Sequence, residues 1–467
     1  MIATGLDHIA EVTGGHLDPP AEDLAAVAEV DAVTTDSRSV PPGAALFVAL
    51  RGEHRDGHDH AQQAVAAGAV ALLAERPLSE PAVPTVVVDD TWRALRELAR
   101  DVRRRVDPVT VAITGSVGKT TVKDLTAAAV AAGRRTHAAR GSYNNELGVP
   151  LTLCGLEADT EVLVAEVGAR QVGDIADLAD LVAPDIAVVT AVAAVHLEVF
   201  GSLEAVARAK GELVEALGPD GLAVLNLADP NVAAMAARAP EVLTVATDLP
   251  EADVHAVDVR LDRHARASAT AVTPWGGARL ELSLAGRHQL VNALFALAVA
   301  GRLGVDPTAA AAAIGAATVS PWRGEIIQLG GVTVLNDAYN ANPTSVAAAL
   351  ETLVSIERSG RTVAVLGEMA EIGADSADEH ARIGRRCAEL GVDLLIGVGE
   401  VADRTVRAAA EDGDTEVVHV ADAVAAADHL DARLAPGDVV LVKASRVAGL
   451  EEVVERLGER RRVEVDP

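Results

Sequence analysis

The chain has 467 residues, of which 50% are hydrophobic and 23% charged. This composition is typical of globular proteins, and the length predicts two to four domains. Its 40 basic and 69 acidic residues give a net charge of −29, which disfavours nucleic acids and anionic membranes as general partners. An anionic substrate would therefore need local basic groups and backbone N–H groups.

The cysteines and the first residues bear on the cellular compartment. Cys154 and Cys387 are too few for a disulfide framework, which favours a reducing compartment. The first ten residues include Asp7 and His8 and lack the basic and apolar segments of a signal peptide. No uncharged apolar run approaches the roughly 20 residues of a membrane helix. We expect a cytoplasmic protein without membrane insertion.

Residues 1–106 form the first predicted domain. Three short apolar runs predict strands, at 45–50, 70–74 and 85–88. Helical patterns lie between them, and a helix is predicted over 92–105. Asp107-Pro108 then breaks the pattern and marks a boundary.

Three histidines in this first domain, His54, His58 and His60, invite interpretation as a metal site. No second cluster of ligands completes such a site. We expect an exposed polar loop instead.

Residues 107–317 form the second predicted domain. Four apolar runs predict strands, at 109–114, 161–165, 186–192 and 222–227. Because helical patterns separate them, we expect a parallel sheet covered by helices. From 254 to 284 the apolar period changes to two, which predicts a small antiparallel meander with a turn at 274–277. The alanine-rich run 309–313 is expected to be helical.

Residues 318–467 form the third predicted domain. Five apolar runs predict strands, at 332–335, 362–366, 393–396, 416–420 and 439–442. They alternate with helical patterns, which is typical of a doubly wound sheet of the dinucleotide-binding type. The predicted fold class is therefore α/β with three domains.

A glycine-containing loop follows the predicted strand at 109–114 and precedes a helix predicted over 120–132. It consists of Gly115, Ser116, Val117, Gly118, Lys119, Thr120 and Thr121. Backbone N–H groups of such a loop bind phosphate oxygens together with the helix N-terminus. Lys119 would reach the terminal phosphates of ATP, and the Thr120 hydroxyl would bind Mg²⁺. Ile113 replaces the first glycine of the common motif, but the flanking strand and helix favour phosphate binding over an ordinary turn.

Two polar residues follow strands of the second domain. Glu166 ends the strand at 161–165, at the carboxyl edge where ligands bind in parallel sheets. Taken alone, it fits a solvated acid as well as a metal ligand. His196 follows the strand at 186–192, and a lone histidine is more often structural than a ligand.

Lys210 lies on the apolar stripe of a helix predicted over 203–217, between Val206 and Leu213. A buried lysine has a lowered pKa, and its neutral amine can add CO₂ to form a metal-binding carbamate. The alternative is a lysine whose stem lies along the stripe while its ammonium reaches water. Periodicity alone favours this alternative.

Motifs over nearly the whole chain resemble those of the Mur ligase family. In the first domain they lie at 36–38, 42–50 and 56–58, in the second at 114–121, 144–150, 166–168, 196–198 and 210–212, and in the third at 337–343, 367–371 and 443–446. The segments 337–343, 367–371 and 443–446 look specific to the member that adds D-alanyl-D-alanine.

The resemblance implies roles for individual residues. Ser37 and Arg38 would belong to the UDP-sugar site. Three residues would join the loop at ATP: Asn292 at the adenine, Arg323 at the phosphates, and Asp337. Thr120 and Glu166 would hold one Mg²⁺ ion, and His196 with a carbamate on Lys210 a second. Catalysis would fall to Lys119, Glu166, His196 and Lys210.

The reaction that the resemblance implies is ATP-driven amide formation between UDP-N-acetylmuramoyl-tripeptide and D-alanyl-D-alanine, in peptidoglycan synthesis. We expect a monomer whose three domains close around these substrates. One alternative is a sister ligase that adds a different amino acid. Another is a regulatory P-loop NTPase, but its Asn-Lys-x-Asp motif is absent from the sequence.

Overall fold

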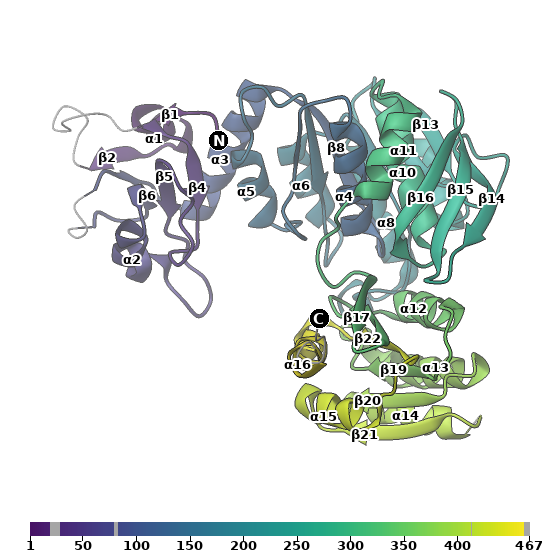
Figure 1. The fold of residues 1–467 in the computed structure, drawn as a ribbon. Helices are drawn as coiled ribbons and strands as arrows, with labels where there is room; N and C mark the ends of the chain where they lie inside the picture. The colour runs from purple at the N-terminus through teal and green to yellow at the C-terminus, as the bar shows by residue number, and fades with distance from the viewer. Residues whose placement is uncertain (19–28, 79–82, 412, 462–467) are drawn as a thin grey trace, which may run out of the picture.

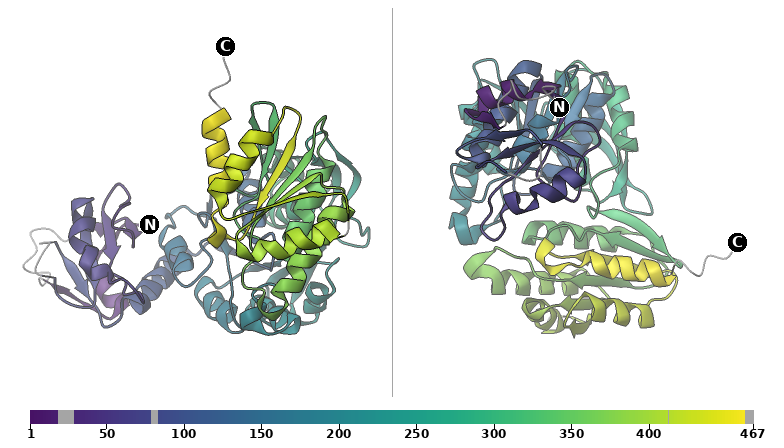
Figure 2. Two further views of the ribbon diagram at one scale, coloured as in Figure 1. Left: turned by 90° about the horizontal axis from the view of Figure 1, so that it is seen from below. Right: turned by 90° about the vertical axis from the view of Figure 1, so that its left-hand side faces the viewer.

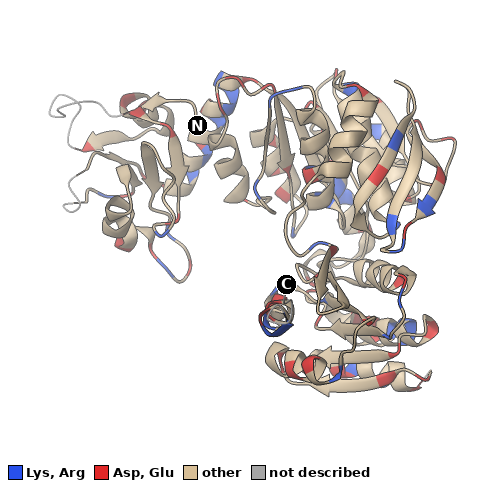
Figure 3. Ribbon diagram, viewed as in Figure 1, with Lys and Arg blue, Asp and Glu red and all other residues tan. Residues whose placement is uncertain are grey.

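The computed structural model describes residues 1–18, 29–78, 83–411 and 413–461. They form three α/β domains, with the N-terminal domain beside one end of the central domain and the C-terminal domain packed below it (Figures 1 and 2). Acidic and basic residues are spread over all three (Figure 3). Among the described helices, none has both the length and the apolar character needed to cross a membrane.

The N-terminal domain is built on a five-stranded sheet. Its order is β2 (His16–Asp18), β7 (Thr85–Val87), β6 (Ala69–Ala74), β5 (Ala45–Val48) and β4 (Ala32–Thr34). Only β2 runs antiparallel to its neighbour. The described part of the domain also contains a short antiparallel pair, β1 (Thr4–Gly5) and β3 (Glu29–Val30), and the α-helices α1 (Leu6–Thr13), α2 (Ala61–Ala66) and α3 (Thr91–Val106). The three predicted strands are confirmed.

The central domain has the predicted parallel sheet, with six strands. Its order is β13 (Glu241–Val245), β12 (Leu222–Asn226), β11 (Ile186–Val189), β8 (Val109–Thr114), β10 (Val162–Glu166) and β9 (Thr136–Ala138). Alternate residues face opposite layers, as the strand period of two requires. One face packs on α4 (Lys119–Ala131), α10 (Gln289–Arg302) and α11 (Pro307–Ala316). The other packs mainly on α5 (Gly148–Cys154), α6 (Asp174–Val182) and α8 (Leu203–Glu215).

The antiparallel meander is also confirmed. Strands β14 (His255–Leu261), β15 (Arg266–Val272) and β16 (Ala278–Ala285) pair in sequence order. Leu280 and Leu282 alternate with exposed residues and join the core formed with α10 and α11. The alternation therefore marks one buried and one solvated face.

The C-terminal domain is a doubly wound sheet. Its order is β17 (Glu325–Leu329), β18 (Val332–Asn336), β22 (Val439–Lys443), β19 (Thr362–Leu366), β20 (Leu394–Val398) and β21 (Glu416–Val420). One face packs on α12 (Pro343–Ser355) and α13 (Ser376–Glu389), with α14 (Asp403–Glu411) beside α13. The other face packs on α15 (Ala423–Arg433) and α16 (Glu451–Arg461).

Strand β17 is the one antiparallel strand of this described sheet, and the sequence analysis did not predict it. It forms a hairpin with β18 through Gly330 and Gly331, whose φ angles of 55° and 80° suit glycine. Its residues alternate only weakly between buried and exposed positions, so the apolar pattern is a poor signal.

Candidate active site

The predicted phosphate loop lies at the carboxyl end of β8, the strand between β11 and β10 in the central sheet. It turns at Gly115 (φ 147°) and Gly118 (φ 83°), and α4 begins at Lys119. The Thr190 hydroxyl donates to the Val117 carbonyl at 2.6 Å, and the Ser116 N–H donates to the Ala191 carbonyl at 2.8 Å. These bonds fix the loop against the segment that follows β11.

Lys119 is held inside this loop, where its Nζ donates to the Gly115 carbonyl at 2.7 Å. Burial lowers the pKa of Lys119, the charge of Glu166 raises it, and the charge of Arg323 lowers it further. Glu166 at the end of β10 and Arg323 at the start of the C-terminal domain therefore both lie within electrostatic reach of Lys119.

Glu166 is fully buried. One carboxylate oxygen, Oε1, accepts hydrogen bonds from the Ser142 hydroxyl at 3.1 Å and the Asn144 amide at 2.6 Å. The other, Oε2, has no hydrogen-bond partner among the described residues. A buried carboxylate oxygen without a partner is costly. Together with the buried Thr120 hydroxyl, it fits Mg²⁺, which prefers oxygen ligands.

Lys210 lies on α8 with 1% of its surface exposed, so the alternative of an ammonium reaching water is wrong. Its Nζ lies 5.9 Å from the centre of the Phe200 ring. Burial and the charge of Lys119 lower the pKa of Lys210 to about 7. A large fraction of the amine is therefore neutral near pH 7.

His196 precedes the short helix α7 (Leu197–Phe200) and has a positive φ of 51°. Its Nδ1 lies 2.5 Å from Oε2 of Glu371 in the C-terminal domain. Burial lowers the pKa of His196, Glu371 raises it, and the charges of Lys119 and Lys210 lower it. His196, Lys119 and Lys210 thus share one electrostatic environment.

The other residues expected at ATP are Asn292, Arg323 and Asp337, and they differ in what they contact. Asn292 on α10 directly contacts it, because a Cβ at Gly118 would lie 2.9 Å from the Asn292 Oδ1. The Arg323 guanidinium stacks 3.9 Å from the centre of the Tyr339 ring. Asp337 binds the Lys443 ammonium at 2.6 Å, and no described hydrogen bond joins Asp337 to the loop.

The two residues expected at the UDP-sugar lie in the N-terminal domain. The buried Ser37 hydroxyl donates to Gln63 Oε1 at 2.9 Å. The exposed Arg38 guanidinium donates two 2.9 Å hydrogen bonds to Asp36 and thereby lowers the pKa of Asp36 to about 2. An anionic ligand would have to compete with Asp36 for Arg38.

The expectation of an exposed histidine loop is wrong for His58, which is 4% exposed. Its Nδ1 lies 2.5 Å from Asp56 Oδ1, and its Nε2 accepts the Glu75 N–H at 2.9 Å. In the part of the chain that is described, no three His, Cys, Asp or Glu residues are grouped as a metal site. A metal ion at the phosphate loop would therefore need the Thr120 hydroxyl, phosphate oxygens or a modified Lys210 as well.

Lys123 is a supporting residue that the sequence patterns did not predict. Lys123 is 1% exposed, and its Nζ donates to the carbonyls of Ala139 and Gly141, each at 2.7 Å. It thereby fixes the segment that carries Ser142, one of the partners of Glu166. Its spacing of one helical turn after Lys119 could have signalled this role.

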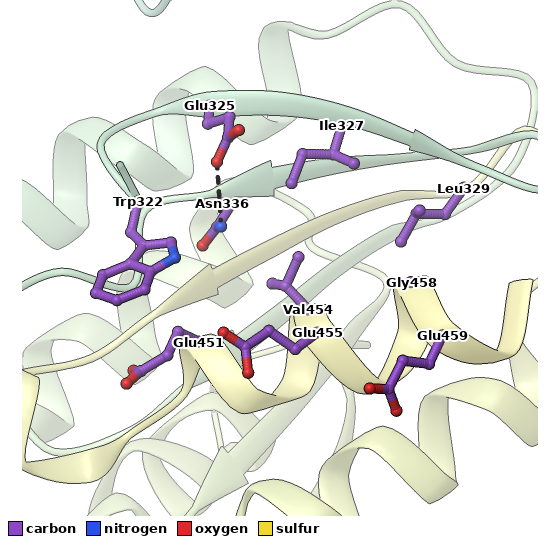
Figure 4. A pocket seen from close by; sticks show the side chains of 10 residues that line it. All are labelled: Trp322, Glu325, Ile327, Leu329, Asn336, Glu451, Val454, Glu455, Gly458 and Glu459. Atoms are coloured by element: carbon purple, nitrogen blue, oxygen red, sulfur yellow. Dashed lines mark hydrogen bonds between the residues drawn. The ribbon is translucent and has the colours of Figure 1, made fainter. Parts of the chain in front are cut away.

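A cavity of about 450 Å³ lies elsewhere, between β17, β18 and α16 (Figure 4). Four glutamates line it, Glu325, Glu451, Glu455 and Glu459. All of its lining residues belong to the C-terminal domain. None of the lining residues belongs to the phosphate loop.

Together, the parallel sheet, the loop at its central strand and the flanking α/β domains define a P-loop nucleotide-binding enzyme. The chain belongs to the Mur ligase family and is an amide-forming ligase. Residues 29–103 match the Mur ligase family catalytic domain, 113–300 the Mur ligase middle domain, and 322–446 the Mur ligase glutamate ligase domain.

Two full-length relatives of this chain share one function. The UDP-N-acetylmuramoyl-tripeptide–D-alanyl-D-alanine ligase of Mycobacterium tuberculosis strain H37Rv is 42% identical over 98% of each chain. That of Escherichia coli K12 is 38% identical over 98% of this chain and 99% of its own. The crystal structure of MurF from Acinetobacter baumannii gives a TM-score of 0.86 at 29% identity, covering 98% of this chain and 99% of that one. MurF from Thermotoga maritima, in complex with ADP, gives 0.79 at 26% identity over 93% and 98%.

Proposed function

We propose that this chain joins D-alanyl-D-alanine to UDP-N-acetylmuramoyl-tripeptide, with ATP cleaved to ADP and phosphate, as a cytoplasmic step of peptidoglycan synthesis. The proposal takes its substrates from relatives that align over 98% of the chain. The structural observation that carries it is the phosphate loop within electrostatic reach of Glu166, whose buried carboxylate oxygen Oε2 has no hydrogen-bond partner among the described residues.

In the proposed reaction, the terminal carboxylate of the tripeptide attacks the γ-phosphorus of ATP, and the bond to the departing ADP oxygen breaks. The neutral D-alanyl-D-alanine amine then attacks the carbonyl of the acyl phosphate, its nitrogen loses a proton to water, and phosphate leaves with the electrons of the C–O bond. The first step brings two anions together, which repel each other strongly at low dielectric constant.

Lys119 and Arg323 would supply positive charge at this step. Lys119 would leave the Gly115 carbonyl, which it contacts in this structure, for the terminal phosphates. The negative charge of ATP would then raise the lowered pKa of Lys119. Asn292, next to Gly118, would contact the nucleotide base, and Asp337 would contribute to the nucleotide site from the C-terminal domain.

Thr120 and Glu166 would hold one Mg²⁺ ion, and His196 with a carbamate on Lys210 would hold a second. Bound Mg²⁺ would offset the charge of the phosphates. The neutral amine of Lys210 can add to CO₂ with loss of a proton to water, and a pKa of about 7 makes that amine available.

Three further assignments belong to the proposal. The domains would be residues 1–106, 107–317 and 318–467, since α3 ends at Val106 and β17 begins at Glu325. Ser37 and Arg38 would bind the UDP-sugar, and the chain would act as a monomer.

ADP release with a panel of amines tests the proposal. Purified protein would receive ATP, Mg²⁺ and UDP-N-acetylmuramoyl-tripeptide, with D-alanyl-D-alanine, single amino acids or a diamino acid as the amine. We expect release only with D-alanyl-D-alanine and close analogues. Release with glutamate or a diamino acid instead would identify a sister ligase.

A further inference from the structure

The contact between His196 and Glu371 joins two domains at the catalytic site. His196 follows β11 in the central domain, and Glu371 lies in the loop after β19 in the C-terminal domain. Their side chains are 2.5 Å apart between Nδ1 and Oε2. An ionised carboxylate can only accept a proton contact, so its position favours the imidazole form that carries a proton on Nδ1.

The loop that carries Glu371 is fixed within its own domain. The Met369 N–H donates to Nε2 of the fully buried His380 at 3.0 Å, and the Ala370 N–H donates to the Ser445 hydroxyl at 2.8 Å. The Ser445 N–H in turn donates to the Glu368 carbonyl at 2.9 Å. Glu371 is therefore presented to the central domain by a rigid segment.

The two domains also approach closely at Gly373, two residues after Glu371. Gly373 has a φ of 78°, and a Cβ there would lie 3.1 Å from the Glu198 backbone. His196 and Glu371 both have positive φ angles, of 51° and 63°. Non-glycine residues adopt this conformation at an energetic cost, and they persist in it where surrounding contacts hold them there.

We propose that Glu371 is a positioning residue: it fixes the tautomer and orientation of His196, so that Nε2 is free to bind the metal ion. This inference rests on the metal-binding role proposed for His196. Because Glu371 belongs to the C-terminal domain, the second metal site is complete only when that domain is docked as it is here. The segment 367–371, which looks specific to this member of the family, would thus serve to position His196.

Mn²⁺ binding tests this inference without turnover. Electron paramagnetic resonance titrations would measure Mn²⁺ affinity in the presence of a non-hydrolysable ATP analogue. In Glu371→Ala we expect the weaker of two Mn²⁺ sites to lose about 10-fold to 100-fold in affinity, the usual effect of removing a partner of a ligating histidine. Glu371→Gln, whose amide oxygen can accept a hydrogen bond from Nδ1, should restore most of it.

A matched control and a double mutant complete the test. Glu389→Gln removes an exposed glutamate that pairs with Arg386 in the same domain and should leave Mn²⁺ affinity unchanged. In His196→Ala, adding Glu371→Ala should have no further effect, because Glu371 acts through His196. Additive losses, or unchanged Mn²⁺ affinity in a folded Glu371→Ala variant, would overturn the inference.

The His196→Ala variant separates the two hypotheses. If it weakens Mn²⁺ binding while Glu371→Ala does not, the inference fails and the proposed metal site stands. If His196→Ala also leaves Mn²⁺ affinity unchanged, then both the inference and the proposed metal role of His196 are wrong.

Discussion

Lys119 lies within electrostatic reach of two other ionisable groups, Glu166 and Lys210; these two are buried, and Lys119 is partly exposed. Burial disfavours charge on each group unless a partner compensates. The Lys119 ammonium donates a hydrogen bond to a backbone carbonyl, and one carboxylate oxygen of Glu166 accepts hydrogen bonds while the other has no partner among the described residues. The pKa of Lys210 is lowered to about 7, so its amine can be neutral and avoid the cost of a buried charge. The site is therefore prepared to take up a polyanion together with cations.

Replacing Lys119 with Ala should lower ADP release by about 10³-fold or more, because a cation at the transferred phosphoryl group is lost. The fold should remain, since Lys119 makes one described hydrogen bond, to the Gly115 carbonyl. Steady-state kinetics and circular dichroism measure the two effects. Near-full turnover in the variant would contradict the assigned role.

Lys210 should make stability depend on pH. Its pKa falls from 10.5 to about 7 on folding, so between these values the unfolded chain binds a proton that the folded chain does not. Stability relative to Lys210→Met should therefore rise with pH, by about 2 kcal/mol from pH 7 to 9. Urea unfolding of both proteins in CO₂-free buffer measures this difference. A constant difference would mean that Lys210 stays charged when folded.

The positions of single residues could be predicted from the sequence where a local pattern determines them. The loop 115–121 was evident because a strand and a helix flank it. The stripe on α8 placed Lys210 facing inward, but periodicity could not show that its ammonium is also buried. The structural role of His58 depends on its contacts with Asp56 and the Glu75 backbone. Because His58 lies in a polar segment of the sequence, nothing in the local pattern indicates that its side chain is buried. Glu371 was unpredictable as a partner because His196 belongs to another domain.

At the scale of elements, the loop between β8 and α4 depends on glycine for space as well as for backbone conformation. A Cβ at Gly115 would lie 2.0 Å from the Thr190 hydroxyl, whereas one at Gly68, also at positive φ (117°), would have nothing within 4 Å. Thr190 in turn fixes the loop through Val117. The element is thus tightly packed before any nucleotide binds.

Gly115→Ala should therefore weaken binding of an ATP analogue by at least about 10-fold and lower the melting temperature more than Gly68→Ala does. Both variants carry the backbone cost of positive φ, and only Gly115→Ala adds the collision. Calorimetry with the analogue and thermal unfolding give the comparison. Equal effects of the two substitutions would show that packing on Thr190 does not matter.

Central strands were predicted more completely than edge strands. Strands β8, β10, β11 and β12 are continuous buried runs, because helices cover both faces of a parallel sheet. The edge strands β9, β13 and β17 are short or partly exposed, so their apolar signal is weak. Strand pairing order also depends on contacts between distant segments, which no local pattern records.

At the scale of the whole molecule, the residues assigned to the reaction come from all three domains. Ser37 and Arg38 lie in the N-terminal domain, the phosphate loop in the central domain, and Arg323 in the C-terminal domain, whose charge reaches Lys119. A net charge of −29 makes this local positive charge necessary for anionic substrates. The relative positions of the domains therefore decide whether the site is complete.

Isotope transfer would show whether a peptide carboxylate attacks the γ-phosphate of ATP on the loop 115–121. UDP-N-acetylmuramoyl-tripeptide would carry ¹⁸O in its terminal carboxylate, and the phosphate formed with ATP and D-alanyl-D-alanine would be analysed by mass spectrometry. The account predicts one ¹⁸O atom in each phosphate formed from fully labelled tripeptide. Phosphate without ¹⁸O, formed alongside the amide product, would contradict it.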